Sequence, residues 1–121
     1  MASDTHSRAR AWAADRLRAA DVGRDATFHL RDESGRRVRV AGRHIEGRQP
    51  NYFSIGPTLA GDPFDDFVVV LFDEDWSVQY AYRLPVEAVI DHHKQPGAQG
   101  CRLMIRGDDG WRSDPRVEHL A

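Results

Sequence analysis

The feature that most constrains the fold is an uninterrupted apolar run, rich in valine, between Asp66 and Asp73. A run of this length without polar alternation is typical of a central β-strand that is covered on both faces. The chain must therefore place a packed layer on each side of one sheet. Its 121 residues are enough for one such core and too few for two. We expect a single domain over residues 1–121.

A second strand follows this run through a turn at Glu74 and Asp75. Polar and apolar residues alternate along it, so its large apolar side chains should share one face of the sheet. Two short helices offer little cover for that face, and monomers rarely expose a large apolar patch. We therefore predict a homodimer, with Trp76, Tyr80 and Tyr82 at the interface. The full expected face is Trp76, Val78, Tyr80, Tyr82 and Leu84.

Two helices are expected on either side of the strands. Apolar residues recur at helical spacing near the N-terminus and predict an amphipathic helix that Gly23 ends. Pro85 suits the start of a second helix, and a last strand follows at 101–105. The predicted fold class is α/β (α+β), with a single mixed β-sheet of about five to six strands flanked by two helices. The first helix buries Ala9, Trp12, Ala13, Leu17 and Ala20.

Residues 23–43 predict a β-hairpin with one apolar face. If Phe28 pairs with Val40 and Leu30 pairs with Val38, the polar residues of both strands lie together on the opposite face. That polar face would hold Asp25, His29, Arg39, Ala41 and Arg43.

The order of expected elements is helix, strand, strand, loop segment, strand, strand, helix, strand. It resembles the α-β-β-β-α-β core of the PD-(D/E)XK, or restriction-endonuclease-like, nuclease superfamily over about residues 8–106. The segments Leu71-Phe72-Asp73-Glu74-Asp75 and Tyr82-Arg83-Leu84-Pro85 are similar to parts of small nuclease-like bacterial proteins. The resemblance implies a restriction-endonuclease-like domain.

In that superfamily an Asp on one strand, and an acid, a spacer and a Lys on the next, surround a Mg²⁺ ion. By resemblance, Asp25 is a vestigial catalytic residue, while Arg39 and Ala41 stand where the acid and the Lys belong. A guanidinium a few Å from the ion would oppose its binding by at least about 1 kcal/mol, even in a water-like dielectric. We therefore expect a catalytically degenerate protein, a pseudo-nuclease that has no cofactor and acts by binding.

An acid from elsewhere could restore the metal site, which leaves an active Mg²⁺-dependent DNA nuclease as an alternative. The candidates are Asp32, Glu33, Asp66 and Asp73, although each is also a reasonable turn or strand-end residue. His92 and His93 do not converge on one ion, because adjacent helical side chains point about 100° apart.

Arginine is concentrated in the first half of the chain. The first 60 residues carry 11 Arg against 7 acidic residues, whereas the other 61 carry 6 basic and 12 acidic residues. Guanidinium groups suit phosphate binding, so we predict nucleic-acid binding, of DNA or RNA, through the hairpin face. A GC-rich genome would also enrich arginine, and a solvated strand face is the simpler alternative. The predicted contacts are Arg37, Arg39, Arg43, Arg48 and Tyr52.

The remaining expectations concern location and partners. No apolar run approaches the roughly 20 residues that cross a bilayer, so no membrane role is expected. The N-terminus has no export signal and Cys101 is the only cysteine, which predicts a cytoplasmic protein. A protein-interaction or homodimerisation module without a nucleic-acid role is the rival to nucleic-acid binding.

Overall fold

Two helices and eight strands make up the fold in a computed structural model that describes residues 2–23, 27–56, 59–95 and 100–121. Among the described helices, none combines the length and apolar composition needed to cross a membrane. The elements in chain order are α1 Ala2–Leu17, β1 Ala20–Asp21, β2 Leu30–Arg31, β3 Arg37–His44, β4 Tyr52–Gly56, β5 Asp66–Phe72, β6 Val78–Pro85, α2 Val86–His92, β7 Cys101–Met104, a 3-10 turn η1 Gly110–Ser113 and β8 Glu118–His119.

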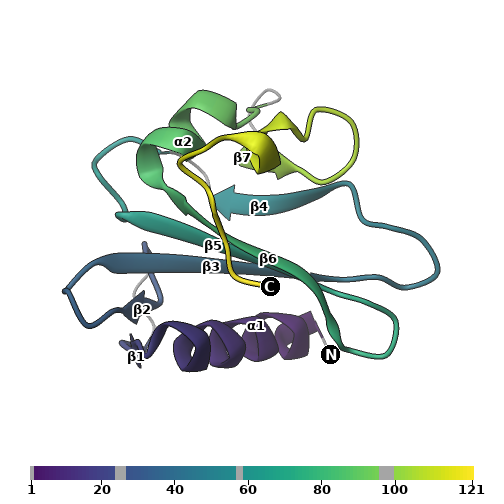
Figure 1. Ribbon diagram of the computed structural model, residues 1–121, viewed down its shortest axis with the longest axis horizontal. Coiled ribbons are helices and arrows are strands. Elements are labelled where there is room, and N and C mark those ends of the chain that lie inside the picture. The colour runs from purple at the N-terminus through teal and green to yellow at the C-terminus, as the bar shows by residue number, and fades with distance from the viewer. Residues whose placement is uncertain (1, 24–26, 57–58, 96–99) are drawn as a thin grey trace.

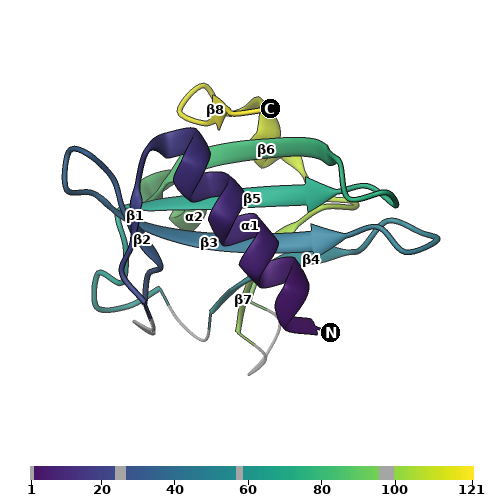
Figure 2. The same cartoon turned by 90° about the horizontal axis from the view of Figure 1, so that it is seen from below.

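Six strands form a mixed sheet in the order β1-β2-β3-β5-β6-β8. Strands β3 and β5 run parallel, and every other neighbouring pair is antiparallel. Helix α1 lies diagonally across one face of this sheet, whereas β4, β7, α2 and η1 cover the other face (Figures 1 and 2). The predicted α+β class, with a mixed sheet and two helices, is confirmed.

Strand β5 is the central strand that the apolar run predicts. All seven of its residues are buried. Val68, Val70 and Phe72 pack in the core beneath α1, and the alternate residues pack in the core on the other face. The chain therefore has two apolar layers, one on each side of a single sheet.

The last predicted strand has a different partner from the rest. Strand β7 pairs with β4 in a separate two-stranded antiparallel sheet, with Tyr52 opposite Met104 and Ser54 opposite Arg102. We call this sheet the β4–β7 ribbon. Its inner residues, among them Phe53 and Leu103, pack on the main sheet, so the ribbon forms part of the second apolar layer.

The first helix ends earlier than predicted. Helix α1 stops at Leu17, and Arg18 adopts a left-handed conformation with φ 52°. The N–H of Ala19 donates to the carbonyl of Ala14 and that of Arg18 to Asp15, which is a Schellman motif with arginine in the usual glycine position. The expected cap at Gly23 is wrong, because residues 20–21 instead pair with β2.

The predicted hairpin register is half correct. Leu30 pairs with Val38 as expected. Phe28 does not pair with Val40, because the His29 ring turns inward and its Nδ1 accepts the Val40 N–H at 2.9 Å. Phe28 packs in the core on the opposite face of the sheet. The predicted pairing of Asp25 cannot be compared, since Asp25 lies outside the described residues.

A β-bulge in β6 divides the predicted apolar face. Leu71 lies opposite Tyr80, but Phe72 lies opposite Val78, so Gln79 is one extra residue on β6. An extra residue reverses the side-chain alternation beyond it. Trp76 and Val78 therefore lie on the α1 side of the sheet, whereas Tyr80, Tyr82 and Leu84 lie on the other side. The expectation of one shared face is wrong.

Candidate nucleic-acid interface

Arg37, one of the predicted contacts, and its neighbour Arg36 form ion pairs within the chain. The Arg37 guanidinium binds Asp65 and Asp62, with N–O distances of 3.1 Å to each carboxylate. Arg36 makes two hydrogen bonds, of 2.8 and 2.9 Å, to the buried carboxylate of Asp66. Arg37 is therefore placed away from any surface shared with Arg43 and Arg48, and its charge is balanced within the fold.

Asp66 is the centre of this buried network. Its side chain is 6% exposed and also accepts from Arg83, whose guanidinium binds Asp32 at 2.6 Å. Burial raises the pKa of Asp32, but hydrogen bonds from Arg83, Ser34 and the Arg36 backbone outweigh it and lower the pKa to about 2. Two of the acids proposed for a relocated metal site thus come together around a cation.

The other candidate acids also have local roles or remain exposed. Asp73 accepts the backbone N–H groups of Asp75 and Ser77 and so closes the turn between β5 and β6. Glu33 is an exposed turn residue. Within the described ranges no three His, Cys, Asp or Glu side chains are grouped to hold a metal ion.

Arg39 and Ala41, which the resemblance aligns with the nuclease acid and Lys, face the second apolar layer. Ala41 is buried in that layer at 9% exposure. Arg39 is half-buried beside Gly56, where a Cβ would come within 3.6 Å of its guanidinium, and burial lowers its pKa. Asp25, the third residue of the expected site, lies in the part that the structure does not describe.

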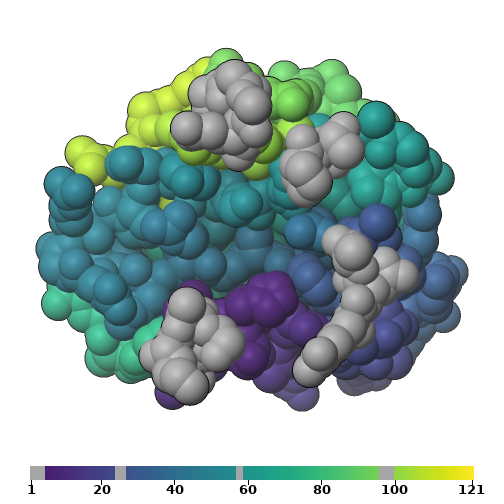
Figure 3. All heavy atoms as spheres, turned by 180° about the vertical axis from the view of Figure 1, so that it is seen from behind, coloured from purple at the N-terminus to yellow at the C-terminus, as the bar shows by residue number. Residues whose placement is uncertain are grey.

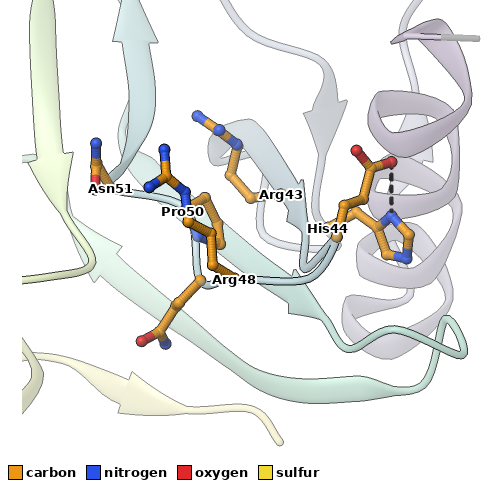
Figure 4. Close-up of a pocket in the computed structure, with 7 residues that line it drawn as sticks. Arg43, His44, Arg48, Pro50 and Asn51 are labelled. Atoms are coloured by element: carbon orange, nitrogen blue, oxygen red, sulfur yellow. Dashed lines mark hydrogen bonds and ion pairs between the residues drawn. The ribbon is translucent and has the colours of Figure 1, made fainter.

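Arg43 and Arg48 lie together at a pocket of about 230 Å³ in the loop between β3 and β4. Arg43 donates from Nη1 to the Tyr52 carbonyl at 2.9 Å, which fixes it against the start of β4. Figure 4 shows Arg43, Arg48 and Asn51 pointing to the same side of the loop, whereas His44 turns toward α1 and contacts Glu46. The pocket is lined by Arg43, His44, Glu46, Arg48, Gln49, Pro50 and Asn51.

Two further arginines, Arg106 and Arg102, lie beside this loop, and neither is among the contacts predicted from the sequence. The Arg106 N–H donates to the Asn51 carbonyl at 3.3 Å, so the chain after β7 lies against the β3–β4 loop (Figure 3). The Arg102 guanidinium lies over the Tyr52 ring at 4.1 Å. The alternation of Arg102, Met104 and Arg106 with apolar residues in the sequence indicates that these three side chains point outward. It does not indicate that β7 pairs with β4.

We call Arg43, Arg48 and Arg106 the basic surface. Among the described residues, no carboxylate oxygen comes within the 4.0 Å ion-pair distance of any of these three guanidinium groups. Arg48 and Arg106 are exposed and Arg43 is half-buried. In contrast to Arg36 and Arg37, these three arginines carry positive charge that none of the described carboxylates contacts.

Tyr52, one of the predicted contacts, lies between two guanidinium groups. Its ring is covered by Arg102, and the Arg43 guanidinium lies 5.5 Å from the ring centroid. The ring is therefore not a bare stacking platform for a nucleobase. It joins guanidinium groups from β3 and β7, which are far apart in the sequence, into one surface.

The predicted dimer residues are largely covered within the chain. Tyr80 is 7% exposed. Tyr82 stacks on His119 at 4.6 Å, and Trp76 stacks on His44 at 3.7 Å with Arg8 also over its ring. Of the described large apolar residues, only Val22 and Ile90 count as exposed. The homodimer stays a prediction, without the exposed face that motivated it.

A second polar cluster lies between α1 and the hairpin. His29 is 8% exposed, and the rings of His29 and His6 meet edge to face at 4.7 Å. Burial lowers the pKa of His29 to about 4, and the nearby positive charges of His6, Arg39 and Arg10 add to this effect. The buried ring is therefore neutral at pH 7 and acts as a hydrogen-bond acceptor.

Comparison with known proteins adds no assignment: no family model matches the chain, and no curated protein matches it. The function of the basic surface is therefore inferred from its own chemistry.

Proposed function

We propose that this protein binds nucleic acid through the phosphate backbone, with Arg43, Arg48 and Arg106 as the contacts, and that it does not cut its ligand. The observation that carries this proposal is the contrast between two groups of arginines. Arg36 and Arg37 are neutralised by buried or half-buried carboxylates, whereas the basic surface has no carboxylate within ion-pair distance among the described residues.

The chemistry of these side chains favours phosphate as the ligand. A guanidinium presents a planar fork of N–H donors that fits two phosphate oxygens, and it remains charged at any physiological pH. Two such groups at a polar pocket, with Arg106 next to the pocket residue Asn51, favour a ligand with several phosphates along its length, which is the property of a nucleic acid. The Asn51 side chain, which points to the same side as Arg43 and Arg48, adds further donors.

The residues in the nuclease positions support binding without cleavage. A hydrolytic Mg²⁺ site needs carboxylates to hold the ion and a Lys to orient the attacking water. Ala41 is part of the core and Arg39 brings a positive charge. This agrees with a restriction-endonuclease-like scaffold whose catalytic motif is degenerate, which remains our proposal for the origin of the fold.

Salt dependence of binding tests the proposed contacts. We expect the logarithm of the affinity for a 20-base-pair duplex to fall linearly with the logarithm of salt concentration. The double variant Arg43→Ala with Arg48→Ala is expected to flatten the slope by about 2 units, since each phosphate contact contributes roughly 0.9. Fluorescence anisotropy between 50 and 200 mM salt, values chosen to span the steep range, measures both slopes.

A matched control removes the same charge elsewhere. Arg16 and Arg18 are exposed at the end of α1. The double variant Arg16→Ala with Arg18→Ala is expected to keep the wild-type slope within about half a unit. Equal flattening in both double variants would mean that only net charge matters, and an absence of binding in the wild type at low salt would reject the proposal.

A further inference from the structure

The outer face of the β4–β7 ribbon carries side chains that can contact more than phosphate. Along β4 and β7, buried and outward residues alternate, and the outward residues sit opposite one another across the two strands. Tyr52 pairs with Met104, and Ser54 pairs with Arg102. Ser54 is exposed and the other three are half-buried.

The ribbon is held rigidly from behind. Its inward side chains are fully buried in the second apolar layer, with exposed fractions between 0% and 2%. The outward face is therefore presented in a fixed orientation and does not need to be ordered on binding, which would cost affinity. The inward residues are Phe53, Ile55, Cys101 and Leu103.

The basic surface lies at one end of this ribbon. Because the strands are antiparallel, the first residue of β4 and the last residue of β7 meet at the same end, where Tyr52 lies opposite Met104. The Arg43 side chain donates a hydrogen bond to the Tyr52 carbonyl, and Arg106 lies two residues after the end of β7. A ligand whose phosphates contact the basic surface therefore has its next groups over Ser54 and Arg102.

We propose that the β4–β7 ribbon enters the major groove of B-form duplex DNA, where Arg102 and Ser54 contact base edges. This inference rests on the proposed function and names its ligand. The major groove is about 12 Å wide and admits a two-stranded β-ribbon, whose strands are about 4.8 Å apart. The Lys94 backbone pairs with Arg102 along the other edge of β7, so a single bridge residue flanks the ribbon at that position. Four residues of strand span about 13 Å, roughly four base-pair steps.

Arg102 is the residue best suited to base recognition. Arginine forms two hydrogen bonds to the O6 and N7 atoms of guanine, the commonest specific contact in the major groove. The Tyr52 ring beneath its guanidinium restricts the orientations of that side chain before DNA arrives, which lowers the entropic cost of the contact. Tyr52 is therefore a positioning residue for Arg102.

Four probes of one sequence and length test the groove assignment at fixed salt. They are duplex DNA, the same duplex with glucosylated 5-hydroxymethylcytosine in place of cytosine, duplex RNA, and single-stranded DNA. The sugar fills the major groove, and the major groove of A-form RNA is too narrow and deep for side chains to read. We expect unmodified duplex DNA to bind at least about 10-fold more tightly than each of the others.

The outcomes separate this inference from the proposed function. Affinities within about threefold for all four probes would overturn the ribbon inference and leave phosphate binding intact. Tighter binding of the single strand would overturn it as well. Binding of none of the probes would reject the proposed function itself, and the ribbon inference with it.

Selection from a random duplex library tests the role of Arg102. The wild type is expected to enrich a motif of about four base pairs, and Arg102→Ala is expected to lose roughly 10-fold discrimination at one guanine of that motif. Arg106→Ala, the control, should weaken all sequences alike. Arg102→Gln provides a second variant if Arg102→Ala unfolds, as judged by circular dichroism. No enriched motif in the wild-type selection would overturn base reading by the ribbon.

Discussion

Acidification from pH 7 to pH 5 is expected to lower the free energy of unfolding by about 2 kcal/mol through His29 alone. In the folded chain the pKa of His29 is about 4, well below the ordinary value of 6.5. The unfolded chain therefore takes up the proton first. The stabilisation is complete above pH 6.5, and it is lost progressively as the pH falls toward 4.

The magnitude follows from the difference between the two pKa values. One pKa unit corresponds to 1.36 kcal/mol, so a shift from 6.5 to about 4 limits the total loss to about 3 kcal/mol. Integration over one titrating group gives about 2 kcal/mol between pH 7 and pH 5. The main cause of the shift is burial of the His29 ring, which disfavours its charged form. The buried Nδ1 also accepts the Val40 N–H, which it cannot do once it is protonated.

Urea unfolding followed by tryptophan fluorescence at half-unit pH steps measures this loss. The variant His29→Gln, which offers an amide oxygen without titrating, is expected to remove most of the pH dependence in this range. His6→Gln is the comparison: the pKa of His6 is also lowered by burial, so it should remove a smaller part. A His29→Gln protein with the wild-type pH dependence would show that the ring is not buried as an acceptor.

Three further predictions concern packing, the buried ion pairs and chemistry. Gly42→Ala should destabilise the fold by about 1–3 kcal/mol in urea unfolding, because a Cβ there would lie 2.6 Å from the Ala9 Cβ of α1; unchanged stability would contradict this close approach. Arg83→Met should lower the free energy of unfolding by about 3 kcal/mol in the same urea assay, because it leaves the buried Asp66 carboxylate with one cation in place of two. A decrease of less than about 1 kcal/mol would refute the stabilising role of this ion-pair network. The purified protein should not cleave plasmid DNA with Mg²⁺ or Mn²⁺; cleavage that Asp25→Ala abolishes would restore the nuclease alternative.

The parts of the fold that the sequence predicts correctly depend on local patterns of hydrophobicity. The apolar run of β5 requires cover on both faces, whatever the covering elements are, and Ala9 and Ala13 of α1 supply part of it. Leu30 and Val38 are also brought together by a short turn. In each case the decisive interaction lies within one element or between close neighbours in the chain.

The errors and omissions depend on partners that are distant in the sequence. Arg36 and Arg37 lie in an arginine-rich segment and look exposed in the sequence, but Asp65 and Asp66, about 30 residues away, neutralise them. The His29 ring points inward because its Nδ1 accepts the Val40 N–H, and hydrophobic alternation along the sequence does not reveal such a bond. Arg106 joins the predicted residues Arg43, Arg48 and Tyr52 only through the pairing of β4 with β7, and a period of two along a strand does not identify its partner.

The pairing of β4 with β7 also determines when the basic surface exists. The two strands are separated by more than 40 residues, so their contact closes a long loop, and such contacts tend to form late in folding. During synthesis Arg43 and Arg48 emerge well before Arg102 and Arg106. A nascent or truncated chain that ends before residue 100 therefore has the loop arginines without the ribbon. Any sequence-selective binding belongs to the completed chain alone.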